Sequence, residues 1–320
     1  MNCAIKRENK RILITGGAGF IGSHLCDYFL TEGDEVICVD NLVTGKIENL
    51  SAALENPRFT FIESDVCEEL GFDVDLVFHL ASPASPVHYT MMPVETLMAN
   101  SIGTMRCLET ALKNGARMVL GSTSEVYGDP AISPQPESYF GNVNPVGIRS
   151  CYDEGKRFSE ALCKAYERAK GAQIVIVRIF NTYGTRMSKD DGRVIPNFVS
   201  QALSGKPLTV YGDGTQTRSF CHISDMVSGL VQAALSERAV GEVLNIGNPD
   251  EVRIIDLASM IIEMTHSCSE VVFEPLPEDD PTKRKPDITK AKEILGWHPR
   301  VPLAAGLEEF IEWVKDRESA

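Results

Sequence analysis

Residues 12–22 read ILITGGAGFIG, and residues 36–40 read VICVD. The first stretch is an apolar run that ends in a glycine-rich turn, and its glycines recur at every third position, at Gly16, Gly19 and Gly22. The first glycine allows a sharp turn, the second lets backbone N–H groups approach a pyrophosphate, and the third lets the following helix pack closely on the sheet. The pattern predicts a strand, a phosphate-binding turn and a helix whose N-terminus faces an anion.

The second stretch follows an expected helix over 20–31 and ends in an acid, Asp40. A carboxylate at the end of that strand accepts hydrogen bonds from the ribose hydroxyls of a dinucleotide and repels a 2′-phosphate, which favours NAD over NADP. A glycine triplet by itself is equally consistent with a tight strand-to-helix turn that binds nothing. The flanking strands and Asp40 together favour NAD as the cofactor.

Further along the chain, short apolar runs alternate with longer amphipathic stretches. The expected strands cover residues 59–62, 76–80, 118–120, 174–179 and 243–246. The expected helices lie near residues 96–113, 152–169 and 224–235. This alternation is typical of a doubly wound parallel sheet with helices on both faces. We therefore expect an α/β protein with a Rossmann-type fold.

The chain has 320 residues, enough for one large α/β domain and a smaller lobe. We predict an NAD-binding Rossmann domain over residues 1–184, to which residues 217–247 return, and a substrate lobe made of residues 185–216 and 248–320. The two parts are thus expected to be interleaved along the chain. The C-terminal lobe should cover the carboxyl ends of the strands, where ligands bind in open α/β sheets.

The composition argues against several kinds of partner and site. The formal net charge is −14 and no basic run occurs, so we expect neither a nucleic-acid nor a membrane partner. The nine cysteines form no CxxC pair and are expected to be buried thiols in a reducing compartment. The six histidines lack metal-ligand spacing, so no metal site is expected. Without an apolar signal region or an apolar run of about 18 residues, the sequence favours a cytoplasmic location.

A candidate proton-transfer pair lies at residues 152–156, which read YDEGK. Helix positions four apart share one face, so the Lys156 ammonium is expected beside the Tyr152 phenol, where it would favour the phenolate. A tyrosine that normally titrates near ~10 could then act as a base at neutral pH. A solvated helix face is the alternative interpretation of such a pair. Thr123, after a predicted strand, supplies a hydroxyl partner and favours the catalytic one.

This combination resembles the extended short-chain dehydrogenase/reductase family, in which a tyrosine, a lysine and a Ser/Thr hydroxyl handle the proton while NAD handles the hydride. After the threonine stand Ser124 and Glu125, whereas sugar-nucleotide 4,6-dehydratases of the family place Asp-Glu there and 4-epimerases lack the acidic pair. The Ser-Glu version is similar to the UDP-glucuronate decarboxylases, or UDP-xylose synthases. The resemblance runs from about residue 10 to 315 and includes the segments 79–86, 121–129, 178–182, 191–194, 216–218 and 280–287.

The resemblance implies NAD-dependent decarboxylation of UDP-glucuronate to UDP-xylose through a 4-keto intermediate, with NAD regenerated. The implied catalytic residues are Tyr152, Lys156, Thr123, Ser124, Glu125 and Arg218. Of these, Ser124, Glu125 and Arg218 would surround the carboxylate of the sugar. Either Glu125 or an ordered water would serve in proton delivery. One alternative is another NAD-dependent sugar-nucleotide enzyme: a 4-epimerase, a 4,6-dehydratase, or a decarboxylase that releases the 4-keto pentose. A second is a non-catalytic NAD-sensing regulator.

The same resemblance implies two sets of binding residues. The cofactor would contact the three glycines, Asp40, Tyr152 and Lys156. It would also contact Phe20, Ile21, Asn41, Thr44, Gly45, Asp65, Val66, Leu80, Ala81, Ser82, Thr182 and Arg193. The UDP-sugar would contact Pro83, Ser85, Asn181, Val194, Asn197, Val210, Tyr211, Gln216, Arg218 and Arg284. The two last arginines suit a diphosphate or a carboxylate because a guanidinium fork matches these anions.

The chain departs from the family pattern at Thr185, where proline is usual, at Phe140, where tryptophan is common, and at Cys221-His222. The resemblance further implies a homodimer built as a four-helix bundle from the helices near 96–113 and 152–169. Apolar positions beyond one face of these helices suit burial against a partner as well as the sheet. The alternative is that both helices are covered within one subunit.

Overall fold

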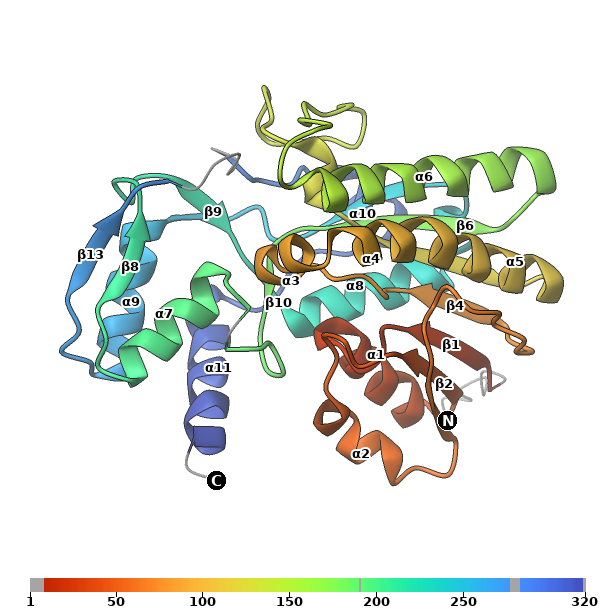
Figure 1. Ribbon diagram of the computed structural model, residues 1–320, viewed down its shortest axis with the longest axis horizontal. Helices are drawn as coiled ribbons and strands as arrows, with labels where there is room; N and C mark the ends of the chain where they lie inside the picture. The colour runs from red at the N-terminus through yellow and green to blue at the C-terminus, as the bar shows by residue number, and fades with distance from the viewer. Residues whose placement is uncertain (1–8, 190, 277–282, 319–320) are drawn as a thin grey trace, which may run out of the picture.

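The computed structural model describes residues 9–189, 191–276 and 283–318 and is built on a seven-stranded sheet (Figure 1). The strand order is β11-β6-β5-β4-β1-β2-β3, and every neighbouring pair is parallel. Its strands are β1 (Arg11–Thr15), β2 (Glu35–Asp40), β3 (Phe59–Glu63), β4 (Leu76–His79), β5 (Arg117–Thr123), β6 (Ile174–Ile179) and β11 (Val243–Ile246). The chain winds outward in both directions from β1, which confirms the predicted Rossmann-type fold.

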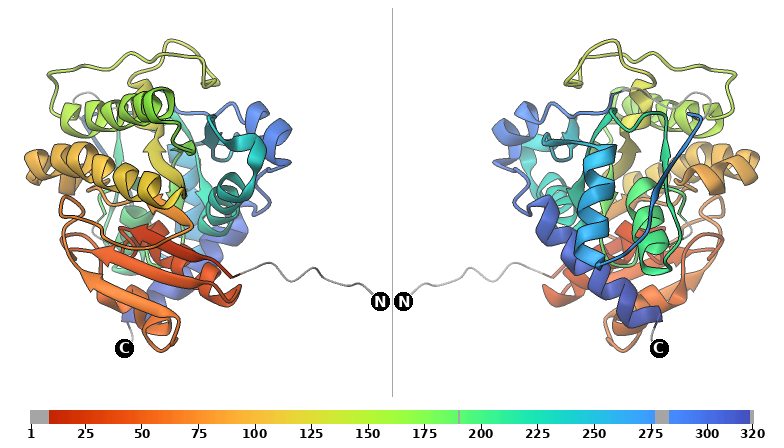
Figure 2. Two further views of the ribbon diagram at one scale, coloured as in Figure 1. Left: turned by 90° about the vertical axis from the view of Figure 1, so that its right-hand side faces the viewer. Right: turned by 90° about the vertical axis from the view of Figure 1, so that its left-hand side faces the viewer.

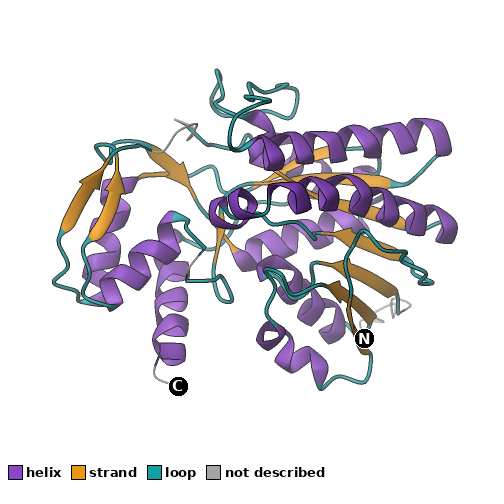
Figure 3. Cartoon of the chain, in the orientation of Figure 1, coloured by secondary structure: helices purple, strands orange, loops and turns teal. Residues whose placement is uncertain are grey.

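Helices cover both faces of the sheet (Figure 3). One face carries α1 (Phe20–Thr31), α8 (Ile223–Leu235) and α10 (Thr289–Leu295), and the other carries α5 (Thr104–Asn114) and α6 (Ser150–Lys170). Successive strand residues point to opposite faces, so in β1 Ile12 and Ile14 pack under the first helix layer while Leu13 packs under the second. Because both faces are buried, these strands read as continuous apolar runs.

The helix expected near 96–113 is not a single α-helix. It consists of α4 (Pro93–Met98), a π-helical segment at Ala99–Gly103 and α5, and it is preceded by α3 (Pro86–Met91). At the irregular turn the Asn100 amide donates to Thr96 O, at 2.8 Å, and to Ser82 Oγ, at 2.9 Å. Polar side-chain partners of this kind accompany π-bulges, which occur often at functional sites. Ser82 lines the cavity described below.

A second lobe with its own apolar core stands beside the sheet (Figure 1), and the right-hand view of Figure 2 shows it in front of the sheet. Its elements are α7 (Val194–Leu203), β8 (Leu208–Tyr211), β9 (Thr217–Ser219), β12 (Glu251–Arg253), α9 (Ile254–Thr265), β13 (Val271–Glu274) and α11 (Leu303–Glu318). In it β8 pairs with β13 and β9 pairs with β12. The sequence predicts that the chain returns to the Rossmann domain at residue 217. In the structure residues 217–219 still pair within the lobe, and the next strand of the central sheet is β11.

The remaining elements are short. They are η1 (Ile47–Leu50), α2 (Ser51–Leu54), η3 (Ser124–Tyr127), β7 (Thr182–Tyr183), β10 (Cys221–His222) and η4 (Glu237–Ala239). Six cysteines are buried as expected, namely Cys26, Cys38, Cys107, Cys151, Cys163 and Cys221. Cys67 is half-buried and Cys268 is exposed, which corrects the expectation for these two, and Cys3 lies outside the described residues. Within the described ranges no helix is long and apolar enough to cross a membrane.

Candidate active site

A cavity of about 700 Å³ lies between the carboxyl ends of the strands and the second lobe. Its walls include the glycine-rich turn, the ends of β2, β4, β5 and β6, and the start of α7. All the site residues expected from the sequence line this cavity except Gly45 and Val210. Parallel strands place their carboxyl ends at one edge, so residues from distant parts of the chain meet there.

The glycine-rich turn has the shape that a dinucleotide requires. A Cβ on Gly22 would lie 2.2 Å from the Gly16 carbonyl oxygen, and a Cβ on Gly16, whose φ is +73°, would lie 2.7 Å from the Ala81 nitrogen. No side chain caps the start of α1 at Gly19, and the first turn of that helix contains no acid. The N-terminal N–H groups of α1 are therefore available to a phosphate. These observations fit NAD.

Asp40 stands at the end of β2 beside this turn. Its carboxylate accepts hydrogen bonds from Leu42 N, at 2.8 Å, and Ala18 N, at 3.0 Å, and burial raises its pKa. Gly45 does not line the cavity, but a Cβ there would lie 2.7 Å from Asp40 Oδ1. Because Gly45 has no side chain, the loop can pass close to the Asp40 carboxylate, and its contact with the cofactor stays a prediction.

The proton-transfer residues come together as expected. Thr123 is the last residue of β5, and Tyr152 and Lys156 lie one turn apart on α6. Lys156 Nζ lies 6.0 Å from the centre of the Tyr152 ring and donates to the Gly121 carbonyl oxygen at 2.8 Å. Tyr152 is 6% exposed and Lys156 is 3% exposed, so neither belongs to a solvated helix face.

The electrostatics differ from the sequence-based expectation that the lysine makes Tyr152 a base at neutral pH. Burial raises the pKa of Tyr152 to about 12, although its hydrogen bond with Thr123 acts in the opposite direction. Burial also lowers the pKa of Lys156, to about 8. The correction has a simple cause: desolvation disfavours both charged forms, the phenolate and the ammonium, in the same enclosed site.

Glu125 is the centre of a buried charge cluster. Arg284 donates through Nη1 to Glu125 Oε1, at 2.6 Å, and to Ser124 Oγ, at 2.9 Å, and its Nη2 lies 3.2 Å from Glu125 Oε2. Arg149 donates through Nη2 to Glu125 Oε2, the oxygen that also lies near Arg284 Nη2. Burial alone would raise the pKa of Glu125, but Arg284 and then Arg149 outweigh it and lower the pKa to about 2. Glu125 is therefore ionised at neutral pH and has no proton to give.

Of the two arginines expected at the substrate, Arg284 is the one that contacts Ser124 and Glu125. Arg218 lines the cavity, but its Nη1 donates to the Thr217 carbonyl oxygen at 2.9 Å. Ser124 and Glu125 are thus in contact with Arg284, and the expectation that Arg218 helps to surround the substrate carboxylate stays a prediction. The Val210 side chain belongs to the apolar core of the lobe and is fully buried there, so its predicted substrate contact would have to come from its main chain.

Sequence reasoning missed Arg149 and Tyr89. The Tyr89 ring, from α3, stacks on the Tyr152 ring with centroids 5.1 Å apart and planes 6° apart, and the Arg149 guanidinium lies 6.0 Å from the Tyr89 ring centre. Tyr89 Oη and Arg284 Nε are buried donors without a hydrogen-bond partner among the described residues, and both residues line the cavity. A helix start at Ser150 would have placed Arg149 one turn before Tyr152. No pattern in the sequence pointed to Tyr89.

Asp153 is a second buried carboxyl group next to this cluster. It is 7% exposed, and its Oδ1 has no hydrogen-bond partner among the described residues. Burial and the neighbouring Glu125 charge raise its pKa to about 7, against the opposing effects of Arg149 and Arg284. A carboxyl group without donors in a buried site favours its neutral form. Asp153 therefore titrates near neutral pH, whereas Glu125 stays ionised.

Comparison with known proteins can now be set beside this geometry. The model of the NAD dependent epimerase/dehydratase family matches residues 12–247. UDP-glucuronic acid decarboxylase 2 of Arabidopsis thaliana is 52% identical over 313 residues, which cover 98% of this chain and 70% of the relative. UDP-glucuronic acid decarboxylase 1 of Danio rerio is 50% identical over 308 residues, 96% of this chain and 73% of the relative.

A solved structure shows the same fold at lower sequence identity. The UDP-glucuronic acid 4-epimerase of Bacillus cereus, in complex with UDP-glucuronic acid and NAD, is 32% identical to this chain. The two structures align with a TM-score of 0.87 over 96% of this chain and 99% of the epimerase. At this similarity the two chains share their whole fold, including the lobe beside the central sheet.

Replacing Asp153 with asparagine is expected to stabilise the protein above neutral pH. The folded-state pKa of about 7 lies above the ordinary value of 3.8, so the native state holds this proton more tightly and native stability falls as the pH rises between these values. The variant lacks this titration. Its advantage in the free energy of unfolding should be small near pH 4 and reach on the order of 2 kcal/mol above pH 7.

Urea unfolding at several pH values measures this difference. Asp73→Asn, the same chemical change at an exposed position, is a matched control and should leave the free energy of unfolding within about 0.5 kcal/mol of wild type. An Asp153→Asn advantage that is the same at about pH 4 and about pH 8 would show that the carboxyl group does not titrate differently in the native state.

Proposed function

The chain belongs to the NAD dependent epimerase/dehydratase family, and we propose that it decarboxylates UDP-glucuronate to UDP-xylose and regenerates NAD in each cycle. The observation that carries this proposal is the position of Arg284, Arg149 and Tyr89 beside Thr123 and Tyr152. A site for a carboxylate thus lies next to a site for a sugar hydroxyl. The relatives at 50–54% identity are named UDP-glucuronic acid decarboxylases, which supports the same activity.

The cofactor would lie along the edge of the sheet from the glycine-rich turn to Lys156. The pyrophosphate would meet the N-terminus of α1, and Asp40 would accept hydrogen bonds from the ribose hydroxyls. Oxidised NAD supplies the electron acceptor for C4 of the sugar and a positive charge beside the Tyr152 phenol. Lys156, whose Nζ is held on Gly121 O, keeps its own charge on the same side of the ring.

Tyr152 and Thr123 would act on the 4-hydroxyl group of the sugar. Thr123 orients the hydroxyl and Tyr152 accepts its proton. Because burial raises the pKa of the Tyr152 phenol, this role requires the additional positive charge that NAD brings to the site. Oxidation at C4 leaves the C6 carboxylate β to a ketone, and such an acid loses CO2 readily. The Tyr152 and Thr123 side chains then stand where the enolate oxygen develops its charge.

The carboxylate end of the sugar would lie against the Glu125 cluster. Arg284 and Arg149 supply two positive charges, and the unpartnered Arg284 Nε and Tyr89 Oη supply two donors for an incoming carboxylate. Glu125 holds both guanidinium groups in place and is already ionised. We therefore assign Glu125 to arranging these arginines, and proton delivery at C5 to water or to another donor.

The second lobe would hold the nucleotide. Its side of the cavity is lined by Asn181, Val194, Asn197, Tyr211 and Gln216, which we propose as uridine diphosphate contacts together with Pro83, Ser85 and Arg218. The division of the chain into an NAD-binding part over 1–184 and 217–247 and a substrate lobe over 185–216 and 248–320 is part of this proposal, with two exceptions in the structure: residues 217–219 pair within the lobe, and α10 packs on the central sheet. The cavity between the central sheet and the lobe supports it.

Incubation with UDP-glucuronate tests the proposed activity. Purified protein should release CO2 and form UDP-xylose, identified by mass spectrometry and NMR, without net accumulation of NADH. No net NADH is expected because the same site oxidises C4 of the sugar and then reduces the 4-keto intermediate with the NADH that it formed. Stoichiometric NADH with a UDP-4-keto pentose would instead make the protein a decarboxylase that releases its intermediate, and UDP-galacturonate without CO2 would make it a 4-epimerase like its 32% identical structural relative.

Two variants should separate the two halves of the reaction. Tyr152→Phe should slow oxidation at C4 at least about 10²-fold with little change in NAD affinity, because it removes the proton acceptor and keeps the ring stacked on Tyr89. Glu125→Gln should leave that oxidation near its normal rate and slow CO2 release at least about tenfold, because the arginines lose their charged partner. NADH absorbance in a single turnover and labelled CO2 report the two steps separately. A common loss of both signals in Glu125→Gln would contradict the division of roles.

We also propose a homodimer through α3, α4 and α6. Exposed apolar side chains gather on these three helices, at Met91, Val94, Leu97, Met98 and Phe158, and an exposed apolar patch of this kind favours association. Val94→Glu should convert a dimer into single chains in sedimentation velocity. Val272→Glu, on the exposed edge of the lobe, should leave the dimer intact. A wild-type protein that sediments as a single chain at micromolar concentration would rule out this interface.

A further inference from the structure

Arg284 belongs to a segment that has no regular structure of its own. Residues 283–288 run between β13 and α10. Their main chain is held by isolated bridges, from Arg218 to Arg284 and from Gln135 to Pro286, and by side chains that include Ser219, whose Oγ donates to Arg284 O at 3.3 Å. The Arg284 side chain is nevertheless 2% exposed and makes short contacts to Ser124 and Glu125. A long side chain holds such a geometry only if its main chain is fixed.

Gln135 supplies three of the hydrogen bonds that hold this main chain. Its side chain is fully buried; Oε1 accepts from Lys285 N at 2.8 Å, and Nε2 donates to Ile132 O at 2.7 Å. Its main chain adds a bond from Gln135 N to Lys285 O, at 2.9 Å, and one from Asp287 N to Gln135 O, at 3.0 Å. Three of these four bonds act on residues within three positions of Arg284. A buried amide with both ends satisfied specifies one register, because any shift leaves polar groups unpaired.

The Gln135 contact is itself anchored to the sheet. Asn245, on β11, donates through Nδ2 to Gln135 O at 2.9 Å and to Asp287 O at 3.1 Å, and its Oδ1 accepts from Tyr127 Oη at 2.8 Å. Tyr127 ends the short helix η3 that also carries Glu125. The Arg284 segment and the Glu125 turn therefore share one buried support.

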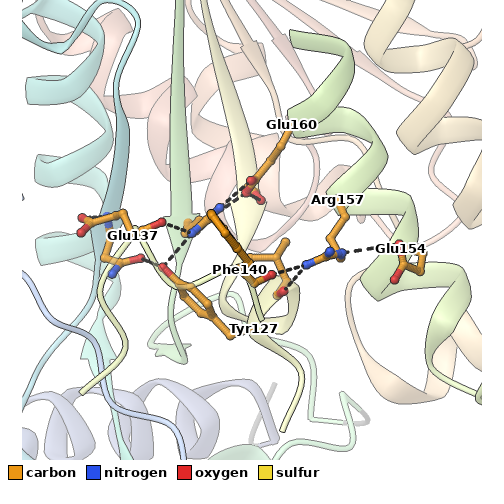
Figure 4. A network of polar contacts seen from close by, with 10 residues as sticks. Tyr127, Glu137, Phe140, Glu154, Arg157 and Glu160 are labelled. Atoms are coloured by element: carbon orange, nitrogen blue, oxygen red, sulfur yellow. Dashed lines mark hydrogen bonds and ion pairs between the residues drawn. The ribbon is translucent and has the colours of Figure 1, made fainter. Parts of the chain in front are cut away.

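The support extends to the helix that carries Tyr152. Arg178, on β6, donates to Tyr127 Oη at 2.9 Å and to both carboxylate oxygens of Glu160, on α6, at 2.9 and 2.7 Å. Figure 4 shows Tyr127, Glu137 and Glu160 converging in this network. Glu137 accepts from Arg178 through its main chain and from Asn245 N through its side chain. The network thus connects both halves of the active site without lining the cavity.

We propose that Gln135 is a positioning residue for the decarboxylation half of the reaction, which acts by holding Arg284 on Ser124 and Glu125. The inference rests on the proposed function, in which Arg284 receives the substrate carboxylate. Gln135 does not line the cavity and does not touch the substrate. Its effect should therefore depend entirely on Arg284 and on the presence of a carboxylate in the ligand.

Binding measurements test this dependence without turnover. In the Tyr152→Phe background, Gln135→Met should weaken UDP-glucuronate at least about fivefold and UDP-glucose, which has no carboxylate, less than about twofold. Methionine keeps the shape of glutamine, but it leaves the Lys285 N–H without its acceptor. Added to Arg284→Ala, the same change should have no further effect on either ligand, because two residues that act through one group are not additive.

Activity of the otherwise unmodified protein gives an independent readout. Gln135→Met should slow CO2 release at least about tenfold while single-turnover oxidation at C4 and NAD affinity stay within about twofold of wild type. The matched control is Asn114→Leu, which removes an amide that donates to Phe72 O and, within α5, to Thr110 O, near the amino ends of β4 and β5. It should change neither ligand selectivity nor CO2 release.

The outcomes separate the two proposals. Equal losses for UDP-glucuronate and UDP-glucose, or equal losses of oxidation and CO2 release, would show that Gln135 is only a structural residue. A further loss on top of Arg284→Ala would also overturn the inference. Failure of the wild-type protein to release CO2 from UDP-glucuronate would overturn the proposed function itself, whereas normal wild-type turnover with normal Gln135→Met selectivity would overturn the role of Gln135 alone.

Discussion

The buried ion pair between Glu125 and Arg284 is the interaction on which the organisation of this active site depends. It joins η3, which directly follows β5, to the segment that leads out of the second lobe, and both residues line the cavity. Removing two charges from water is costly, and such a pair does not by itself make a strong case for stability. Its value here is geometric: a bidentate guanidinium and a carboxylate fit in one orientation, and that orientation presents Arg284 to the cavity.

The charged groups of the site are held away from their ordinary protonation behaviour. Burial raises the pKa of Tyr152 and Asp153 and lowers that of Lys156, while Glu125 is kept ionised by its two arginines. Groups whose pKa values are shifted in opposite directions within one enclosed site are typical of sites that transfer protons. The same burial means that the structure holds these groups at a cost in stability, which the large apolar cores on both faces of the sheet offset.

The support behind the site is polar as well as apolar. Arg178, Tyr127 and Asn245 come from β6, η3 and β11, and their side chains are bonded to one another at 2.8 to 2.9 Å. A fully satisfied buried network specifies a unique arrangement more strictly than apolar packing does. This explains how a segment without regular structure, residues 283–288, places a catalytic-site arginine reproducibly.

The sequence by itself determined the elements whose signals are local. The glycine triplet and Asp40 identified the cofactor turn, the apolar runs identified the strands, and the spacing of Tyr152 and Lys156 identified the catalytic helix, because backbone sterics and helical periodicity act over a few residues. The resemblance carried by Ser124 and Glu125 pointed to the chemistry. These predictions needed no knowledge of how the chain folds back on itself.

Only the tertiary structure decided what distant segments contribute. It brought Arg284, and not Arg218, to Glu125, stacked Tyr89 on Tyr152, turned Val210 into the core and broke the helix near 99–103. The burial that raises the pKa of Tyr152 also comes from elements far apart in the chain. The physical reason is the same in each case: contact and desolvation depend on neighbours in space, and a linear pattern contains no record of which loops meet at the edge of a sheet.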